Sequence, residues 1–439
     1  MDRRQFLAAT TAGMSAAAAG CVEAFQSLEG TTYGREPPLV DPRPNAIYWP
    51  THTEAMHHGE VAETDDGLAL HLMYTFPHRF WQVISTDEGY GTQKFEVGPD
   101  DAVHIMVGVW DAETEVVFPV SSLNVAITGG DGVDERETIY PMLSQRMGFH
   151  YGDNYHLDGD DSYTVEVTVG GVDVNRFGEF EGRFGDAETI SMELDYSETE
   201  RNDLEFEMYD DRQGQRGAVE PMGMDGHSEM DDAMDDHDGM DDDDHDEMND
   251  NDHDEMDDGG HDMHHQMPLG FVHDLEAAGG EPMGEAMLDD IRYRAALFDD
   301  ERFGDEPYLA VTAATRYNDL SIPEMGLAVH VGSADETVEI DVVAEDIDDF
   351  EPEDDDEPLV DAQSPTEPRE IQVVDPDSAV LSEQLEPGLD PEIGFHYGVS
   401  APELNGGEDV TVDISTPTQV ARHEGYETVF FDTQQITLE

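Results

Sequence analysis

Short segments in which apolar and polar residues alternate occupy most of the first half of the chain. The clearest are residues 68–74, 103–110, 123–128, 163–169 and 190–196. Alternation with a period of two is typical of strands that bury one face, and the Gly, Asp and Pro residues between these segments favour turns. No long stretch has the 3.6-residue period of an amphipathic helix. We therefore predict an antiparallel β-sandwich over residues 46–218.

The same pattern resumes towards the end of the chain. It covers residues 291–298, 307–317, 326–332, 410–415 and 428–438. An acidic, proline-containing stretch at residues 345–370 interrupts the pattern and is expected to be a long loop. The segment 276–439 is thus predicted to form a second β-sandwich.

A five-residue repeat relates the two halves. The first half contains Gly148-Phe149-His150-Tyr151-Gly152, and the second contains Gly394-Phe395-His396-Tyr397-Gly398. In each half a turn and a strand-like segment follow, and chance does not readily produce such a match. The predicted fold class is therefore all-β, with two tandem copies of one sandwich.

Residues 219–275 separate the two copies and differ from them in composition. Asp, Met, His and Gly dominate, as in residues 230–237 and 261–265. Such a segment has too little apolar surface to offset its ordering entropy, so we predict that it is disordered. Its His and Met residues favour loose binding of several metal ions, although a spacer grown by repeat expansion is the other interpretation. Deleting residues 219–267 is expected to remove weakly bound ions and leave the unfolding of the sandwiches nearly intact.

Residues 1–21 have the pattern of an export signal. Arg3 and Arg4 precede a weakly apolar stretch that ends in Ala19-Gly20-Cys21, as in a twin-arginine signal with a lipobox. We expect a lipoprotein that begins at Cys21, with residues 22–45 as a tether at the outer face of the cell membrane. Replacing Cys21 by Ser is expected to release the protein or leave it unprocessed. Because Cys21 is the only cysteine, the chain can form neither an intramolecular disulfide nor a thiolate metal cluster.

The formal net charge of −87 indicates adaptation to high salt. Molar salt shortens the Debye length to about 3 Å, which relieves the repulsion between so many carboxylates. The acidic residues are spread along the whole chain, so most of them are expected to be solvated. An excess of this sign argues against nucleic acid as a partner.

Imidazole, thioether and carboxylate remain as ligands for a metal ion outside the cell. Methionine favours Cu(I), whereas histidine accepts copper, iron or zinc. His71 and Met73 lie two positions apart on a predicted strand, so both project from one face. Met142 and His150 flank the turn that leads into the five-residue repeat. A hydrogen-bonded strand histidine and methionines that fill the core are the ordinary alternatives.

The sequence also resembles the family of periplasmic metal-binding proteins known as Fe2+ transport proteins, in a tandem haloarchaeal form. The resemblance rests on Pro141-Met142, the segment from Gly148 to Gly152 with Asn154, Leu70-His71-Leu72-Met73, and Arg422-His423. It implies an immunoglobulin-like sandwich that captures iron or copper and delivers it to a membrane permease or reductase. It also implies a homodimer in which the late histidine reaches the site of the partner.

The two copies depart from the family pattern in complementary ways. Met73 replaces a glutamate, and a longer spacing before His150 leaves Met147 as a rival to Met142 for the thioether position. The second copy has Arg292 and Arg294 where ligands are expected. It lacks a methionine before His396, but it has Arg422-His423 where the first copy has Arg176-Phe177. From this complementary loss we predict one composite metal site, with His396 as a structural remnant, built from His71, Met73, Met142, His150 and His423.

Other histidines stay open as candidates. His57, His58 and His78 lie close to the first predicted strand, and any of them could replace one of the five ligands. Packing or hydrogen bonding is the expected role of three more: His104, His156 and His330. Since ligation needs neutral imidazole, metal affinity is expected to fall as the pH drops through the histidine range near 6.5.

The leading functional hypothesis is a binding protein rather than an enzyme. The sequence has no carboxylate pair, Ser/His/Asp set or nucleophile elbow at an interpretable spacing. A copper redox enzyme and an acidic surface domain that binds only bulk cations are the alternatives. Further homo-oligomerisation of the tandem is left open.

Overall fold

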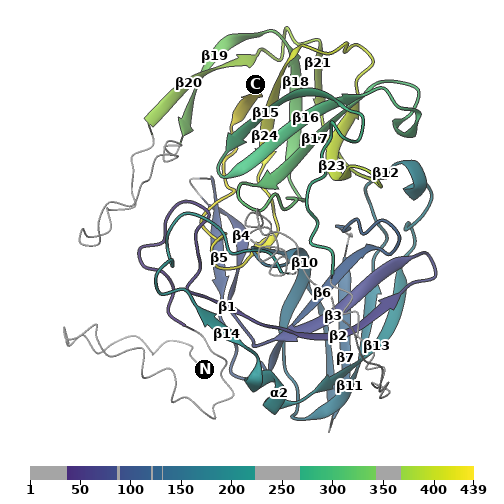
Figure 1. The fold of residues 1–439 in the computed structure, drawn as a ribbon, viewed down its shortest axis with the longest axis vertical. Coiled ribbons are helices and arrows are strands. Elements are labelled where there is room, and N and C mark those ends of the chain that lie inside the picture. Colours follow the sequence, from purple (N-terminus) through teal and green to yellow (C-terminus); the bar gives the residue numbers. More distant parts are fainter. Residues whose placement is uncertain (1–36, 87–88, 120–121, 131, 223–266, 343–366) are drawn as a thin grey trace, which may run out of the picture.

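The fold is all-β in the computed structural model, which describes residues 37–86, 89–119, 122–130, 132–222, 267–342 and 367–439. Cys21 and most of the Met/His-rich segment lie outside these residues. Within them the only helices are short: α2 (Glu198–Asp203), η1 (Gly178–Phe180) and η2 (Glu301–Phe303). None of the helices in this part of the chain is long and apolar enough to cross a membrane. Figure 1 shows two lobes, the first copy in purple to teal and the second in green to yellow.

The first copy is built from two sheets. The larger has eight strands in the order β2 (His57–Glu63), β3 (Leu68–Thr75), β6 (Val103–Asp111), β10 (Gly148–Tyr155), β9 (Tyr140–Ser144), β25 (Ala421–Arg422), β4 (Phe80–Thr86) and β5 (Gly89–Phe95). The smaller has four, β13 (Glu188–Tyr196), β11 (Asp161–Val169), β7 (Leu123–Gly129) and β8 (Val133–Thr138). A two-stranded ribbon pairs β1 (His52–Glu54) with β14 (Phe206–Met208).

The second copy repeats this plan. Its larger sheet has six strands, β12 (Asn175–Arg176), β22 (Glu386–Asp390), β23 (Gly394–Ser400), β17 (Tyr308–Thr315), β16 (Ile291–Phe298) and β15 (Glu281–Leu288). The smaller sheet has four, β21 (Leu381–Gln384), β18 (Gly326–Gly332), β24 (Asp409–Thr416) and β26 (Gln435–Leu438). β19 (Ala334–Val342) and β20 (Glu367–Val374) form a separate hairpin.

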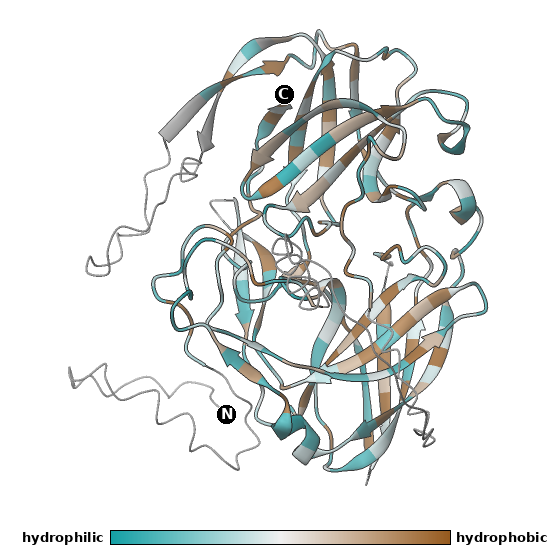
Figure 2. Ribbon diagram, in the orientation of Figure 1, coloured by the Kyte–Doolittle hydropathy of each residue, from teal (hydrophilic) through white to brown (hydrophobic). Residues whose placement is uncertain are grey.

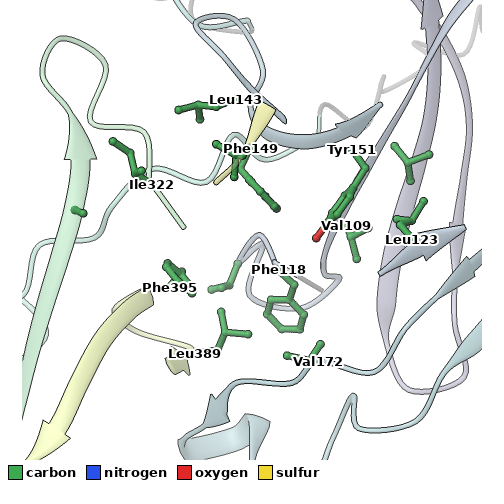
Figure 3. Close-up of a cluster of buried hydrophobic side chains, with 14 of the residues drawn as sticks. Val109, Phe118, Leu123, Leu143, Phe149, Tyr151, Val172, Ile322, Leu389 and Phe395 are labelled. Atoms are coloured by element: carbon green, nitrogen blue, oxygen red, sulfur yellow. The ribbon is translucent and has the colours of Figure 1, made fainter. Parts of the chain in front are cut away.

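Alternation along the strands explains the core of each sandwich. In β11 buried and more exposed residues alternate, because one face packs on the other sheet and the other meets solvent; Figure 2 shows the corresponding change of hydropathy along the strands. Phe149 and Phe395, which are equivalent in the two repeats, lie in one buried cluster that spans both copies (Figure 3).

β3 and β6 are an exception, since every residue in both is buried. Their first face packs in the sandwich core, through residues such as Leu70 and Val107. Their second face carries Met73 and Met106, which pack in a cluster with Met147 and Met267. The outer face of β3 and β6 is therefore covered rather than exposed to solvent.

The two copies exchange one short strand each. β25, from the second copy, inserts between β9 and β4 of the first copy, with Ala421 opposite Met142. β12, from the first copy, pairs in parallel with β22 of the second copy, with Asn175 opposite Gly388. Figure 1 shows β12 beside the lobe formed by the second copy. The tandem thus has the architecture of a dimer with swapped segments within one chain.

The flanks of the Met/His-rich segment differ from the expected disorder. Val219 is buried and its backbone N–H donates to Gln145, while Met267, Leu269 and Leu275 are buried as well. A deletion of residues 219–267 would therefore remove packed side chains at both ends, and its design has to spare them.

Candidate metal centre

The outer face of the eight-stranded sheet gathers the histidines and methionines of the first copy. Opposed residues on antiparallel strands project from the same face. Met142 lies opposite His150, Met73 opposite Met106, and His104 opposite Asn154. The second copy adds β25 to this sheet and brings His423, which follows β25, against His78 and His104.

Three imidazoles meet there at ligand distance. One nitrogen each of His78, His104 and His423 lie within 4.8 Å of one another. His104 comes from β6, His78 from the connection between β3 and β4, and His423 directly follows β25. The ring centroids of His78 and His104 are 3.9 Å apart, and those of His78 and His423 are 4.8 Å apart.

His150 and Met142 complete the cluster. The His150 ring lies 5.2 Å from that of His423, measured between centroids. A Cβ atom built on Gly152 would lie 2.6 Å from His104 Nε2 and 3.2 Å from Met142 Sδ. These two atoms therefore approach each other over the glycine, and the absence of a side chain at position 152 leaves room for them.

Hydrogen bonds fix the tautomers of three of the histidines. The Nδ1 atoms of His78, His104 and His150 face oxygen acceptors, namely Phe76 O at 3.2 Å, Asn154 Oδ1 at 2.9 Å and Gly148 O at 3.0 Å. An oxygen acceptor places the proton on Nδ1 and leaves the lone pair on Nε2. Asn154 also donates to the carbonyl of His78 and accepts from its backbone N–H, so one amide holds the His104 ring and the backbone of His78.

The Nε2 atoms of His78, His104, His150 and His423 are buried and form no hydrogen bond with any described residue. A buried polar atom without a partner costs about 1–3 kcal/mol, so four in one place demand an explanation. Converging nitrogens of His78, His104 and His423, with the His150 ring beside them and three of the four rings held through Nδ1, form an arrangement in which imidazole binds a transition metal. The residues present therefore fit such an ion.

Burial also sets the protonation state of the cluster. It lowers the pKa of His150 to about 4, and the pKa values of His78, His104 and His423 fall well below the ordinary 6.5. Neighbouring imidazoles lower the pKa values of His78, His104 and His423 further, because two adjacent rings resist carrying charge together. The four rings are neutral at physiological pH, and competition with protons sets in at lower pH than the 6.5 expected from the sequence.

The second copy positions His423 through the neighbouring residues. The Arg422 guanidinium is fully buried and donates to the carbonyls of Thr418, Val429 and Phe430. The N–H of His423 donates to Leu143 O of the first copy at 3.2 Å. Arg79 and Glu424, the residues after His78 and His423, form an ion pair of 3.2 Å between the copies.

The structure brings together three of the five residues assigned to the site from sequence, Met142, His150 and His423. His71 lies on the same face but stacks on His58, with centroids 5.2 Å apart. Met73 and Met147 pack in the apolar methionine cluster. Of the two rivals for the thioether position, it is Met142 that lies beside His104.

The sequence predicts packing or hydrogen bonding for His104, and it makes His78 one of three alternative metal ligands near the first predicted strand. The pattern His104-Ile105-Met106 repeats the i, i+2 spacing of His71 and Met73 on a second predicted strand. That spacing is the signal that could have identified His104. His57, His58, His156 and His330 remain outside the cluster; His330 faces Ser382 and His156 faces Asp100 O.

The equivalent place in the second copy is closed. His396 Nδ1 faces Gly394 O at 3.1 Å, as in His150, but His396 Nε2 is paired with the Tyr308 hydroxyl at 3.1 Å. Gly388 stands opposite His396 where Met142 stands opposite His150, and Phe177 packs on the ring at 5.7 Å. Arg292 and Arg294 are ion-paired with Asp319 and Glu285. His396 therefore has no free lone pair directed at an ion.

The model of a family described as a domain of unknown function, DUF7350, matches residues 276–351 and 365–439. No protein of curated function matches the chain.

Several solved structures are similar to about a third of this chain. FetP of uropathogenic E. coli, expressed in the periplasm, is 18% identical and covers 33% of this chain and 97% of its own, with a TM-score of 0.25. A copper-bound FetP variant is 19% identical over 32% of this chain and 97% of its own, with a TM-score of 0.24. A copper-bound variant of Campylobacter jejuni P19 is 16% identical over 33% of this chain and 98% of its own, with a TM-score of 0.24.

Proposed function

We propose that this protein binds one transition-metal ion in a composite site shared by its two copies. The ligands are the Nε2 atoms of His78, His104, His150 and His423, with the thioether of Met142 beside them. The observation that carries the proposal is the convergence of His78, His104 and His423 from both copies, with one nitrogen of each within 4.8 Å of the others. The His150 ring lies beside that of His423, and the Nε2 atoms of all four rings are buried without a hydrogen bond to any described residue.

The donor set favours copper over iron. Imidazole accepts both metals, but a thioether selects the softer Cu(I). The three histidines at ligand distance, His78, His104 and His423, donate neutral imidazole nitrogens. No carboxylate of a described residue belongs to this group. Iron is the alternative cargo, and titration with both ions separates the two.

The ion is cargo in this proposal, and the protein delivers it rather than transforming a substrate. The twin-arginine signal and the lipobox at Cys21 support a lipid-anchored protein outside the cytoplasm. A membrane permease or reductase would receive the ion there. The buried site, reached from both copies, suits retention of an ion until such a partner opens it.

Metal analysis of the purified chain tests the binding step. After dialysis with a weak chelator, the wild type should retain a tightly bound copper ion that His104→Ala loses. His330→Ala is the matched control, because His330 faces Ser382 in the second copy and should not change the tight ion. Equal copper content in the wild type and His104→Ala would refute the proposal.

A further inference from the structure

A pocket of about 130 Å³ adjoins the four-histidine cluster. His78 and His423 line it, and so do His52, Glu54 and Met56. Three further metal-competent side chains therefore share one pocket with two of the cluster histidines.

Pairing of β1 with β14 fixes the positions of His52 and Glu54. The two residues lie at i and i+2, so both project from one face of the ribbon. His52 stacks on Phe206 with a centroid distance of 4.8 Å, and its Nδ1 lies 2.9 Å from Thr51 Oγ1. The ring is held, and its Nε2 is directed towards Glu54.

Glu54 carries the strongest indication of a ligand. Its side chain is only 7% exposed, and Oε1 is buried and forms no hydrogen bond with any described residue. Oε2 lies 3.3 Å from the Thr75 hydroxyl, which also faces Ala55 O at 2.9 Å. A buried carboxylate is costly unless a cation or donors compensate it. His52 Nε2 lies 3.6 Å from Glu54 Oε1. Two ligands at about 2.1 Å from one tetrahedral ion are separated by about 3.4 Å.

We infer that His52 and Glu54 form a second metal site in this pocket, beside the four-histidine site. The inference rests on the proposed function, which it extends from one ion to two. A carboxylate and an imidazole suit a divalent ion such as Cu²⁺, Fe²⁺ or Zn²⁺, and Met56 adds a thioether at the wall. The charge of Glu54 attracts the ion into the pocket, and the neutral histidine cluster lies next to it.

The competing interpretation is an ion pair between Glu54 and a protonated His52, with no metal. The two interpretations differ in the copper content of the chain and in the spectrum of the bound copper. A Cu²⁺ ion in the pocket and one in the adjoining histidine cluster would be close enough for dipolar coupling between their electron spins, whereas a single ion beside an ion pair is magnetically isolated.

Electron paramagnetic resonance of the full chain, loaded with Cu²⁺ and kept oxidised because Cu(I) gives no signal, distinguishes these cases. The wild type should show dipolar broadening and a half-field transition. Glu54→Gln, which keeps the size of the side chain, should bind one ion fewer and lose the coupling, but retain the isolated signal of the four-histidine site. Glu63→Gln changes an exposed glutamate of β2 and is the matched control. Copper held elsewhere in the chain is the same in all variants and cancels in the difference.

Each outcome bears on a different claim. An unchanged copper content and spectrum in Glu54→Gln would overturn the second site and leave the four-histidine site standing. Loss of the tight ion from His104→Ala, with coupling lost in Glu54→Gln as well, supports both. Absence of tight copper from the wild type would refute the proposed function itself.

Discussion

Gly152 decides whether the ligands of the cluster can meet. His104 Nε2 and Met142 Sδ occupy the space that a side chain at this position would need. The residue belongs to β10, where it lies opposite Met106, and it has no left-handed backbone conformation that would by itself require glycine. Its role is to leave space over the sheet rather than to permit a turn.

Gly152→Ala should therefore weaken metal binding without unfolding the protein. The new methyl group would displace His104 or Met142, and we expect an affinity loss of about tenfold or more, the size found when outer contacts of a metal site are disturbed. Copper titration measures the loss, and thermal unfolding checks the fold. In the control Gly91→Ala, the added Cβ meets only Thr86 Cγ2, at an ordinary 3.4 Å. Wild-type affinity in Gly152→Ala would mean that these two atoms do not bind the ion together.

His396 isolates the effect of burying a neutral histidine. Burial lowers its pKa to about 4 from the ordinary 6.5. Between these pH values the unfolded chain binds a proton that the folded chain does not. The stabilisation is thus complete above pH 6.5 and is lost as the pH falls to 4.

The difference in unfolding free energy between the wild type and His396→Asn should shrink as the pH falls. We expect it to decrease by roughly 3 kcal/mol between pH 7 and pH 4, as a shift of this size implies. Buried carboxyl groups with raised pKa values, such as Asp289, act in the opposite direction in both proteins and cancel in the difference. Denaturant unfolding of the metal-free proteins at constant salt measures this difference in unfolding free energy. A difference that does not change with pH would contradict the lowered pKa of His396.

At the level of single residues, the sequence predicted only some of the ligands of the proposed metal site. His150 and Met142 stood out because the five-residue repeat and its flanks mark them. His78 and His104 did not, because their position depends on how β6 pairs with β3 and β10. Register between distant strands is set by the packed fold, and a strand histidine alone does not reveal it.

Among the elements, the exchanged strand β25 has the greatest effect on the site. It is only two residues long, yet it places His423 against the first copy. The ion pair between Arg79 and Glu424 joins the connection after β3 to the residues after β25, and both side chains are only 9% exposed. Arg79 and Glu424 directly follow His78 and His423 in sequence, so the ion pair holds the two segments that carry these histidines together.

Glu424→Gln should lower copper affinity by about tenfold, because His423 loses the contact that holds its loop against His78. Arg79→Gln should lower it to a similar extent, and the double variant should be no weaker than either, as expected for one interaction. Glu96→Gln breaks the exposed pair with Lys94 and should leave affinity unchanged. Full affinity in both single variants would separate the ion pair from the metal site.

The alternation of apolar and polar residues predicted several of the longer strands correctly. Residues 291–298 and 326–332 match β16 and β18, and 68–74 and 123–128 match β3 and β7 within a residue. The exchange of β25 and β12 could not come from alternation, because two residues carry no period. The complementary loss of ligands, together with the homodimer that the family resemblance implies, pointed to a contribution of His423 to the first copy but not to the exchanged strands themselves.

On the scale of the whole molecule, the chain is an asymmetric pair. Each copy receives a short strand from the other, but the two receiving sites differ in their chemistry. One holds four histidines whose Nε2 atoms form no hydrogen bond with any described residue, and in the other Tyr308 and Phe177 pack against His396. This asymmetry supports the proposal of one composite site shared by the two copies. The tandem arrangement secures it within a single polypeptide, where a homodimer would form two.

Copper titration of His423→Ala, His150→Ala and His396→Ala tests the composite site most directly. His423 and His150 come from different copies, yet each replacement should weaken the tight ion by more than about 100-fold, beyond the effect of an outer contact. His396→Ala should leave the affinity and number of tight ions unchanged, with its fold checked by thermal unfolding. If His396→Ala instead removed a tight ion while His423→Ala bound copper like the wild type, each copy would hold its own metal, and the composite site would be contradicted.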